Sequence, residues 1–213
     1  MKIGIIGGTG GMGNLFSQVF QNAGHEVLIA GRNTPLRKED IARLADVIVI
    51  SVPIRDTVFV IDEITPLLGE HQILADLTSL KIDPVSAMLR SKARVVGLHP
   101  MFGPTVGTIQ GQTIVATPAR CHENDLWFFQ NIFESQGARV TITTAEEHDR
   151  MMAVIQGLTH FKAILLAGTM RRLGISPADT ESYMSPVYRI ETGIAGRLLA
   201  QNPDLYADIL CMN

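Results

Sequence analysis

Short apolar runs alternate with helical repeats along the first two thirds of the chain. Continuous apolar runs of strand length are typical of strands buried on both faces of a parallel sheet. The predicted strands cover residues 3–6, 27–30, 47–51, 72–75, 94–98, 113–116 and 138–142, and the predicted intervening helices include residues 36–44, 57–68, 82–90 and 123–135. This order predicts an α/β fold with a doubly wound parallel sheet.

The pattern changes near residue 143. Residues 145–173 and 186–201 carry long helical repeats, and the pattern there predicts no strand. The sequence therefore predicts two domains. Residues 1–143 form a dinucleotide-binding domain, and residues 144–213 form a smaller, all-helical domain.

Composition narrows the function classes. The 213 residues are 46% hydrophobic and 18% charged, with a formal net charge of −3. Without a basic stripe, nucleic acid is not an expected partner. The two cysteines lack metal or redox spacing, so no metal site is expected.

No uninterrupted apolar run reaches the roughly 18 residues of a membrane span. The first strand begins too early for a signal peptide, and we expect a cytoplasmic protein.

A glycine-rich turn follows the first strand. Its spacing, Gly8-x-Gly10-x-x-Gly13, lies between a strand and a helix, which is the context of a Rossmann-type dinucleotide-binding loop. Gly8 is expected to permit the tight turn, Gly10 to let the backbone approach a pyrophosphate, and Gly13 to let helix and strand pack closely. The predicted phosphate-binding residues are Gly8, Thr9, Gly10, Gly11, Met12 and Gly13.

The end of the second strand bears on the choice between NAD and NADP. An acidic residue that binds the ribose hydroxyls is expected there in an NAD enzyme, but the chain reads Gly31-Arg32-Asn33-Thr34. Arg32 offers a planar, permanently charged group to a 2′-phosphate, and Asn33 and Thr34 add donors. The loop favours NADP, and NAD remains the alternative.

Candidate catalytic residues follow two further strands. His99 comes at the end of the strand at 94–98, where ligands bind in doubly wound sheets, and a histidine there can accept a proton near neutral pH. Ser79 and Lys81 follow the preceding strand and are expected to reach the same site. Taken singly, Ser79 is more typical of a helix cap and Lys81 of a surface cation.

Several segments together resemble the prephenate dehydrogenase family of tyrosine biosynthesis. They are DLTSLK at 76–81, GLHPMFGP at 97–104, EHD at 147–149, QGLTHF at 156–161 and SPVYRIE at 185–191. The resemblance spans essentially the whole chain, and it is to the dehydrogenase part of the bifunctional chorismate mutase–prephenate dehydrogenases. It implies a Rossmann domain, a helical domain that forms a homodimer, and an active site between the two.

The resemblance also implies roles for individual residues. His99 would accept the proton of the ring 4-hydroxyl of prephenate, and Ser79 would support that hydroxyl or His99. Arg189 would bind a substrate carboxylate, and His160 is a weaker candidate for the substrate site. Ser51 and Pro53 would line the cofactor pocket. The implied reaction is the oxidative decarboxylation of prephenate to 4-hydroxyphenylpyruvate, with hydride transfer to NAD(P).

The sequence leaves several alternatives open. The ring substrate can instead be arogenate or 4-amino-4-deoxyprephenate. The chain can also be another NADP-dependent Rossmann reductase or a protein that binds NADP without catalysis. For His148 and Asp149, capping of a long helix is as good an account as catalysis. Relatives usually continue beyond the equivalent of Asn213, so the chain is either naturally short or truncated.

Overall fold

The protein is described here by a computed structural model that covers residues 1–200 and 203–212, with side chains for all of these except 203–206. Contacts between Cα atoms divide the chain into two compact units, Met1–Asp149 and Arg150–Asn213. The boundary near residue 143 remains a prediction from the sequence pattern. The last residue of the predicted helix at 186–201 lies outside the described residues.

The first unit contains a seven-stranded sheet in the order β2-β1-β3-β4-β5-β6-β7. Its elements are β1 (Lys2–Ile6), α1 (Gly11–Asn22), β2 (Glu26–Ala30), α2 (Lys38–Leu44), β3 (Val47–Ile50), α3 (Ile54–Ile64), β4 (Ile73–Asp76), α4 (Ile82–Met88), β5 (Arg94–Pro100), β6 (Thr113–Arg120), α5 (Glu123–Glu134) and β7 (Arg139–Ile142). The five strands from β2 to β5 pair in parallel. The predicted Rossmann-type α/β fold is confirmed.

One feature of the sheet differs from the prediction of a wholly parallel sheet. β6 pairs antiparallel with β5, so that His99 lies opposite Val115, and β7 pairs parallel with β6. A parallel neighbour requires a crossover, usually a helix. The connection at 101–112 contains only the short 3₁₀ turn Pro104–Val106, and the chain therefore returns antiparallel to β5.

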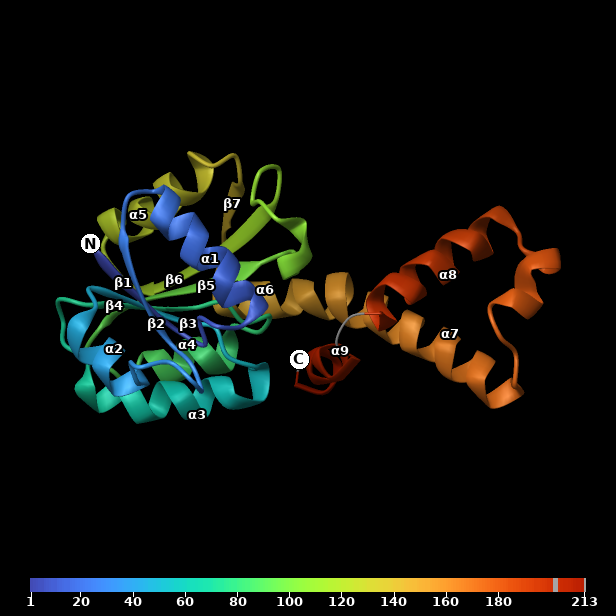
Figure 1. Cartoon of the computed structure of the whole chain (residues 1–213), viewed down its shortest axis with the longest axis horizontal. Coiled ribbons are helices and arrows are strands. Elements are labelled where there is room, and N and C mark those ends of the chain that lie inside the picture. Colours follow the sequence, from blue (N-terminus) through green and yellow to red (C-terminus); the bar gives the residue numbers. More distant parts are fainter. Residues whose placement is uncertain (201–202, 213) are drawn as a thin grey trace. The chain divides into compact units, whose positions relative to one another are not determined.

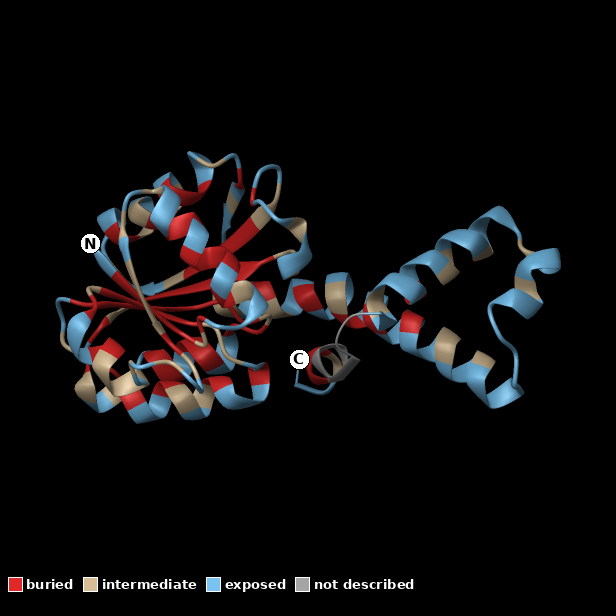
Figure 2. Cartoon of the chain, in the orientation of Figure 1, coloured by how far each residue is buried: buried red, intermediate tan, exposed pale blue. Residues whose placement is uncertain are grey.

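Helices cover both faces of the sheet: α1 and α5 lie on one face, and α2, α3 and α4 on the other (Figure 1). Successive strand residues point to opposite faces. Ile5 accordingly packs with Phe16 of α1 in one core cluster, and Ile6 packs with Ile61 of α3 in the other. Two buried faces explain why the strands read as uninterrupted apolar runs, and Figure 2 shows the central strands buried.

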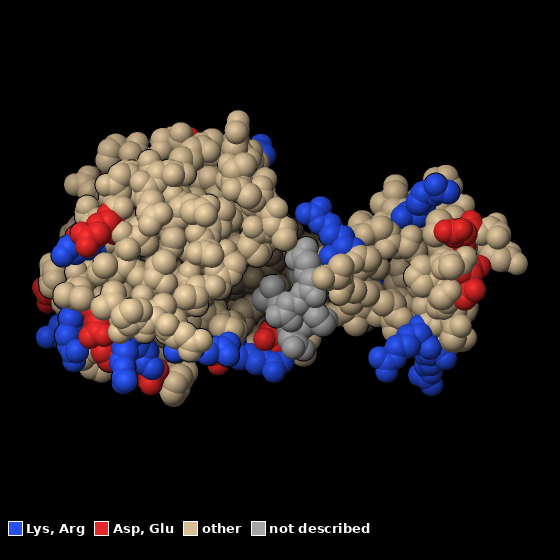
Figure 3. Space-filling view, in the orientation of Figure 1, with Lys and Arg blue, Asp and Glu red and all other residues tan. Residues whose placement is uncertain are grey.

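Charged side chains of both signs intermingle on the face of the first unit seen in Figure 3, over α2 and α3. Lys38 pairs with Glu63 at 2.6 Å, and Arg90 pairs with Asp62. The Arg90–Asp62 pair is exposed and the Lys38–Glu63 pair is partly exposed, and surface pairs of this kind contribute little to stability. The visible surface of the first unit therefore carries charges of both signs.

The second unit is helical. A continuous helical stretch begins in the first unit with α6 (Ala145–Met152), whose last residues belong to the second unit, and continues through the π-helical segment Ala153–Leu158 and α7 (Thr159–Leu173). It is followed by α8 (Pro186–Leu199) and α9 (Pro203–Met212). The predicted long helix at 145–173 is confirmed. Ser185 caps α8 by accepting a hydrogen bond from the Tyr188 N–H at 3.1 Å. Much of the surface of α7 and α8 is exposed (Figure 2).

The stretch Ala145–Leu173 is long and apolar enough to cross a membrane, by length and composition alone. The sequence predicted no such segment, because no uninterrupted apolar run is that long, whereas mean hydropathy over a window tolerates the polar residues in between. A single helix of this kind is weak evidence for a membrane span, since helices of soluble proteins pass the same test.

Candidate functional site

A pocket of about 1000 Å³ opens at the carboxyl ends of β1, β2 and β3. These strands are neighbours in the order β2-β1-β3, where the winding of the sheet reverses. Ligands of doubly wound sheets bind at such a switch point. The pocket lining includes Thr9 and Gly10 from the glycine loop, Arg32 and Asn33 after β2, and the segment that follows β3, with Ser51 and Pro53.

The glycine loop is shaped by close approaches between backbone atoms. Gly7 has φ of +88°, and a Cβ there would lie 2.2 Å from the Ser51 carbonyl oxygen. The tight turn is therefore at Gly7 rather than at Gly8, where the sequence analysis placed it. A Cβ at Gly8 would instead lie 2.5 Å from the Ile29 side chain. A Cβ at Gly13 would lie 2.5 Å from the Gly7 oxygen, as expected for close packing of helix and strand.

The glycine loop leads into the N-terminus of α1. Gly10 caps the helix, and the first helical residues are Gly11, Met12 and Gly13. Amide N–H groups in a first helical turn lack intrahelical acceptors, and they carry the positive end of the helix dipole. A Cβ at Gly10 would meet only the Gly7 oxygen, at 3.3 Å. The loop is thus open enough for a pyrophosphate to approach its backbone.

Of the three residues after β2 that are proposed to bind a 2′-phosphate, two line the pocket and one does not. Arg32 and Asn33 are exposed and line the pocket. The Thr34 hydroxyl is instead engaged within the loop: it accepts the Gly31 N–H at 2.7 Å and lies 2.8 Å from the Leu36 carbonyl oxygen, to which it donates. Thr34 therefore holds the loop that presents Arg32.

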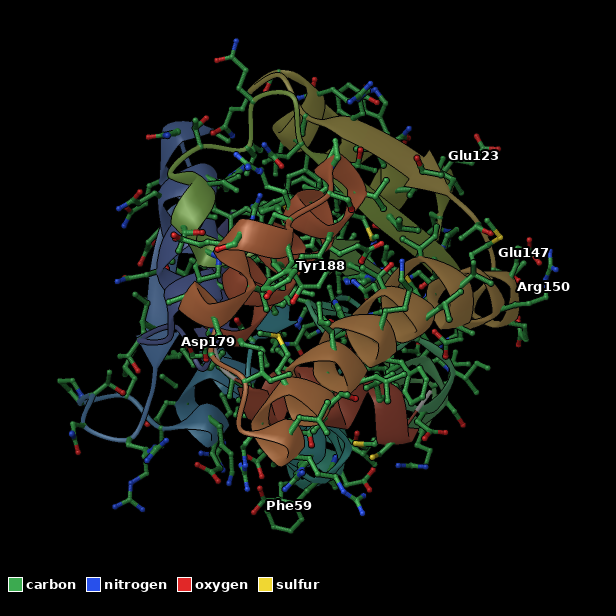
Figure 4. The ribbon with its side chains drawn as sticks, turned by 90° about the vertical axis from the view of Figure 1, so that its right-hand side faces the viewer. Phe59, Glu123, Glu147, Arg150, Asp179 and Tyr188 are labelled. Carbon is green, nitrogen blue, oxygen red and sulfur yellow. The ribbon has the colours of Figure 1, made fainter. Side chains whose placement is uncertain are left out.

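Further side chains line the outer part of the same pocket. Arg37 and Lys38 at the start of α2 add positive charge, and Asp56 and Glu63 of α3 add negative charge. Phe59 of α3 also lines the pocket, is 65% exposed, and projects away from its helix (Figure 4). The pocket lining thus carries charges of both signs, with Lys38 paired to Glu63 at 2.6 Å, and an aromatic surface on α3.

A second cluster surrounds His99. The strand β5 continues through Pro100, so His99 lies within the strand and is only 2% exposed. Its Nδ1 lies 2.8 Å from Nε2 of His148 on α6. Burial, followed by the nearby charges of His148 and Lys81, holds the pKa of His99 well below 6.5. His99 is therefore neutral at neutral pH and is able to accept a proton.

Asp149 connects this pair of histidines to α4. Its Oδ1 lies 2.6 Å from His148 Nδ1 and accepts the Lys81 N–H at 2.8 Å, and its Oδ2 accepts the Ile82 N–H at 2.9 Å. Burial alone would raise the pKa of Asp149. The hydrogen bonds from His148, Ile82 and Lys81, with the charge of His148, lower it below 3.8. Asp149 is thus a fixed carboxylate.

Lys81 is fully buried, in contrast to the surface position considered for it in the sequence analysis. Its Nζ forms an ion pair with Asp76 and donates to the Leu98 carbonyl oxygen at 2.8 Å. Gly97 leaves room for this side chain, because a Cβ there would lie 3.0 Å from Lys81 Cδ. Ser79 is half-buried in the same connection, between β4 and α4.

The remaining two proposed site residues belong to the second unit. His160 on α7 is 8% exposed, and burial lowers its pKa. Arg189 on α8 is exposed, one residue after Tyr188, whose hydroxyl lies 3.6 Å from Met170 Sδ on α7 (Figure 4). Both residues sit on helices that pack against each other within this unit.

Comparison with known protein families assigns both parts of the chain. Residues 21–142 match the nucleotide-binding domain of prephenate dehydrogenase, and residues 144–213 match the dimerization domain of prephenate dehydrogenase. The chain belongs to the prephenate dehydrogenase family. This membership separates it from the other reductase families that the sequence analysis left open.

Relatives and solved structures agree with the family. The probable arogenate/prephenate dehydrogenase of Methanocaldococcus jannaschii is 35% identical over 232 residues, covering 100% of this chain and 52% of its own length. The T-protein of Haemophilus influenzae is 38% identical over 210 residues, covering 98% and 55%. The chain spans about half the length of these relatives. The crystal structure of prephenate dehydrogenase from A. aeolicus, in complex with hydroxyphenyl propionate and NAD+, has a TM-score of 0.80 at 21% identity, covering 100% of this chain and 82% of that one.

The structure also adds residues that the sequence analysis did not assign. His148 and Asp149 stand directly behind His99, although they are 49 residues or more away in the sequence. The available signal was the position of EHD at the start of a long helix, which capping explains equally well. Their position beside His99 depends on the packing of α6 against the end of β5, which the local sequence pattern does not reveal.

Proposed function

We propose that this chain catalyses the oxidative decarboxylation of prephenate to 4-hydroxyphenylpyruvate, with NADP as hydride acceptor. The observation that carries the proposal is the buried, neutral His99 in the same unit as the dinucleotide pocket. A base with a pKa below the working pH is suited to take a proton from a hydroxyl as hydride leaves its carbon. Membership of the prephenate dehydrogenase family supports the choice of substrate.

The proposed roles follow the chemistry of each side chain. His99 accepts the 4-hydroxyl proton of the ring and returns it to the phenol oxygen after carbon dioxide has left C1. Ser79 supports the hydroxyl or His99. Arg189 binds a substrate carboxylate, which suits an exposed guanidinium, and His160 contributes to the substrate site. When bound, the nicotinamide supplies the acceptor for the hydride from C4.

The cofactor would be held by the first unit alone. The glycine loop and the first turn of α1 would bind the pyrophosphate through Gly8 to Gly13, and Ser51 and Pro53 would line the pocket. Arg32 and Asn33 would bind the 2′-phosphate. The pocket volume of about 1000 Å³ suits a bound dinucleotide.

The second unit is proposed to form a homodimer. It matches a dimerization domain, and it exposes large apolar side chains, among them Phe161 and Leu165 on α7 and Val187 and Ile190 on α8. Exposed apolar patches of this kind mark interfaces between proteins. An interface also accounts for the apolar composition of the stretch Ala145–Leu173 without a membrane.

The direct test is the absorbance of reduced nicotinamide in the purified protein, with prephenate and either NADP or NAD. We expect turnover with prephenate and NADP. Arogenate is the second candidate substrate, since the M. jannaschii relative carries both names and the ring chemistry is the same. Turnover with arogenate but not with prephenate would overturn the substrate, and no turnover with either would leave an NADP-binding protein.

Replacing Arg32 by alanine is expected to raise the KM for NADP by about 10- to 100-fold, because a hydrogen-bonded charge pair contributes about 1.5–3 kcal/mol. The KM for NAD should change little, since NAD has no 2′-phosphate. Arg43→Ala, which removes an exposed arginine from α2, is the matched control. An equal loss with both cofactors would contradict the assignment of Arg32 to the phosphate.

A further inference from the structure

The segment between β2 and α2 is a short loop whose two ends are held together. Ala30, the last residue of β2, forms a parallel bridge with Leu36. The Thr34 hydroxyl accepts the Gly31 N–H at 2.7 Å and donates to the Leu36 carbonyl oxygen at 2.8 Å. The loop is therefore closed by its own hydrogen bonds, which hold its first and last residues beside each other.

This loop presents two arginines to the dinucleotide pocket. Arg32 lies near its start and Arg37 at its end, and both are exposed and line the pocket. Among the described residues, neither arginine forms an ion pair. Lys38, the next residue, differs, because its Nζ lies 2.6 Å from a carboxylate oxygen of Glu63. The uncompensated positive charge of the pocket lining therefore belongs to the two arginines.

We propose that Arg32 and Arg37 bind the 2′-phosphate of NADP together, from the two ends of one loop, and that Arg37 is thus a second residue that determines cofactor specificity. Thr34 is a positioning residue, because its hydroxyl closes the loop that carries both arginines. The inference rests on the choice of NADP in the proposed function. It does not depend on which ring compound is oxidised.

The chemistry of the phosphate is matched better by two cations than by one. A phosphate monoester carries a charge of about −1.5 to −2 at neutral pH and presents three acceptor oxygens. A guanidinium has a single positive charge and donates two parallel N–H bonds to such a group. Two arginines therefore match both the charge and the acceptors, whereas Arg32 alone would leave about half of the charge uncompensated.

Gly31 excludes the kind of side chain that would favour NAD. In NAD-binding domains of this fold, an acidic residue at the end of the second strand binds the ribose hydroxyls. A Cβ at Gly31 would lie 2.6 Å from Thr9 Oγ1 and 2.9 Å from Thr9 Cγ2. The Thr9 side chain thus fills the space in which an acidic side chain would begin. Residues 31–37 contain no carboxylate that would repel a phosphate.

Three carboxylates elsewhere in the pocket lining oppose an anion. Glu63 and Glu39 lie 2.6 and 4.0 Å from Lys38 Nζ, which offsets part of their charge. Asp56 lies in the first turn of α3, where the positive end of the helix dipole offsets part of its charge. Because Lys38 is engaged in this way, the attraction for a phosphate comes from the two arginines, and the loss of either should weaken binding.

The inference is tested by isothermal titration calorimetry of the full chain with NADP and with NAD, without a ring substrate. The two cofactors differ only in the 2′-phosphate. We expect Arg37→Ala, like Arg32→Ala, to weaken the binding of NADP by about 10- to 100-fold and that of NAD by less than about threefold. Arg43→Ala, at an exposed arginine further along α2, is the matched control and should bind both cofactors like the wild type.

The positioning role of Thr34 is tested with a pair of substitutions. Thr34→Val keeps the shape of the side chain but removes the hydroxyl, and we expect it to weaken the binding of NADP by about 3- to 30-fold. Thr34→Ser keeps the hydroxyl and should bind NADP within about threefold of the wild type. Equal losses of NADP and NAD binding in Thr34→Val, or equal losses in the two variants, would overturn the positioning role.

The binding data separate this inference from the proposed function. If Arg37→Ala binds NADP as tightly as the wild type, or loses NADP and NAD equally, the role of Arg37 is overturned and the choice of NADP stands on Arg32. If the wild type binds NADP no more tightly than NAD, the choice of NADP and this inference both fail. If binding follows our expectation but no ring substrate is turned over, the proposed reaction fails and the inference stands.

Discussion

Replacing His99 by asparagine is expected to lower kcat by roughly 10²–10⁴-fold, the usual contribution of a general base. Asparagine retains an amide group that can hydrogen-bond to His148 Nε2, and it fills most of the space of the imidazole. The substitution therefore removes the proton acceptor while preserving the buried contact. Steady-state kinetics with prephenate and NADP measure the effect.

The pH dependence of the wild type should agree with this role. The neutral imidazole is the active form, and the His99 pKa lies well below 6.5 because the group is buried beside His148 and Lys81. The ratio kcat/KM should hence stay level as the pH falls from about 8 to 6.5, and decline only at lower pH, where His99 becomes protonated. An acid limb centred at pH 6.5 would indicate an exposed histidine instead.

The matched control for His99→Asn is His71→Asn, because His71 is an exposed histidine. We expect this control to keep wild-type kcat. If His99→Asn retained turnover near that of the wild type, the assignment of His99 as the base would be wrong, whatever the behaviour of the cofactor site.

The parts of the fold that follow from local patterns were predictable. Continuous apolar strands, the glycine turn before α1 and the long helix at 145–173 each depend on residues close together in the chain. The reversal of β6 was missed because it depends on a connection without a crossover helix, at 101–112. A proline- and glycine-containing segment of this length, with no helical repeat, was the available signal.

The candidate site was predictable only in part, for a related reason. Arg32 and Asn33 follow a strand end and line the pocket, so local context places them correctly. His148 contacts a residue 49 positions away in the sequence, and Asp149 contacts residues 67 and 68 positions away. Lys81 pairs with a residue 5 positions away. Hydrophobic periodicity describes none of these contacts. Lys81 in particular is predicted to be a surface cation from the sequence, because a lysine is rarely fully buried unless it is paired.

Substituting Lys81 by methionine is expected to destabilise the protein by about 3–5 kcal/mol, because breaking a buried ion pair leaves the other charge uncompensated. Lys81 and Asp76 are both fully buried. The substitution removes the cationic partner of the Asp76 carboxylate, which keeps the hydrogen bonds from the Thr78 N–H and hydroxyl. The Leu98 carbonyl oxygen loses the hydrogen bond from Lys81. Urea unfolding followed by circular dichroism measures the loss.

A double substitution separates lost charge pairing from lost packing. Asp76→Asn with Lys81→Met removes both charges and retains an amide that can accept from Thr78, so most of the lost free energy of unfolding should return. Lys92→Met, at an exposed lysine, should change the free energy by less than about 0.5 kcal/mol. If the double variant were as unstable as Lys81→Met, the lysine would stabilise the fold by its packing over Gly97 rather than by its charge. Because Lys81 also holds the carbonyl of Leu98, the residue before His99, a stable double variant with reduced kcat would show that this bond aligns the base.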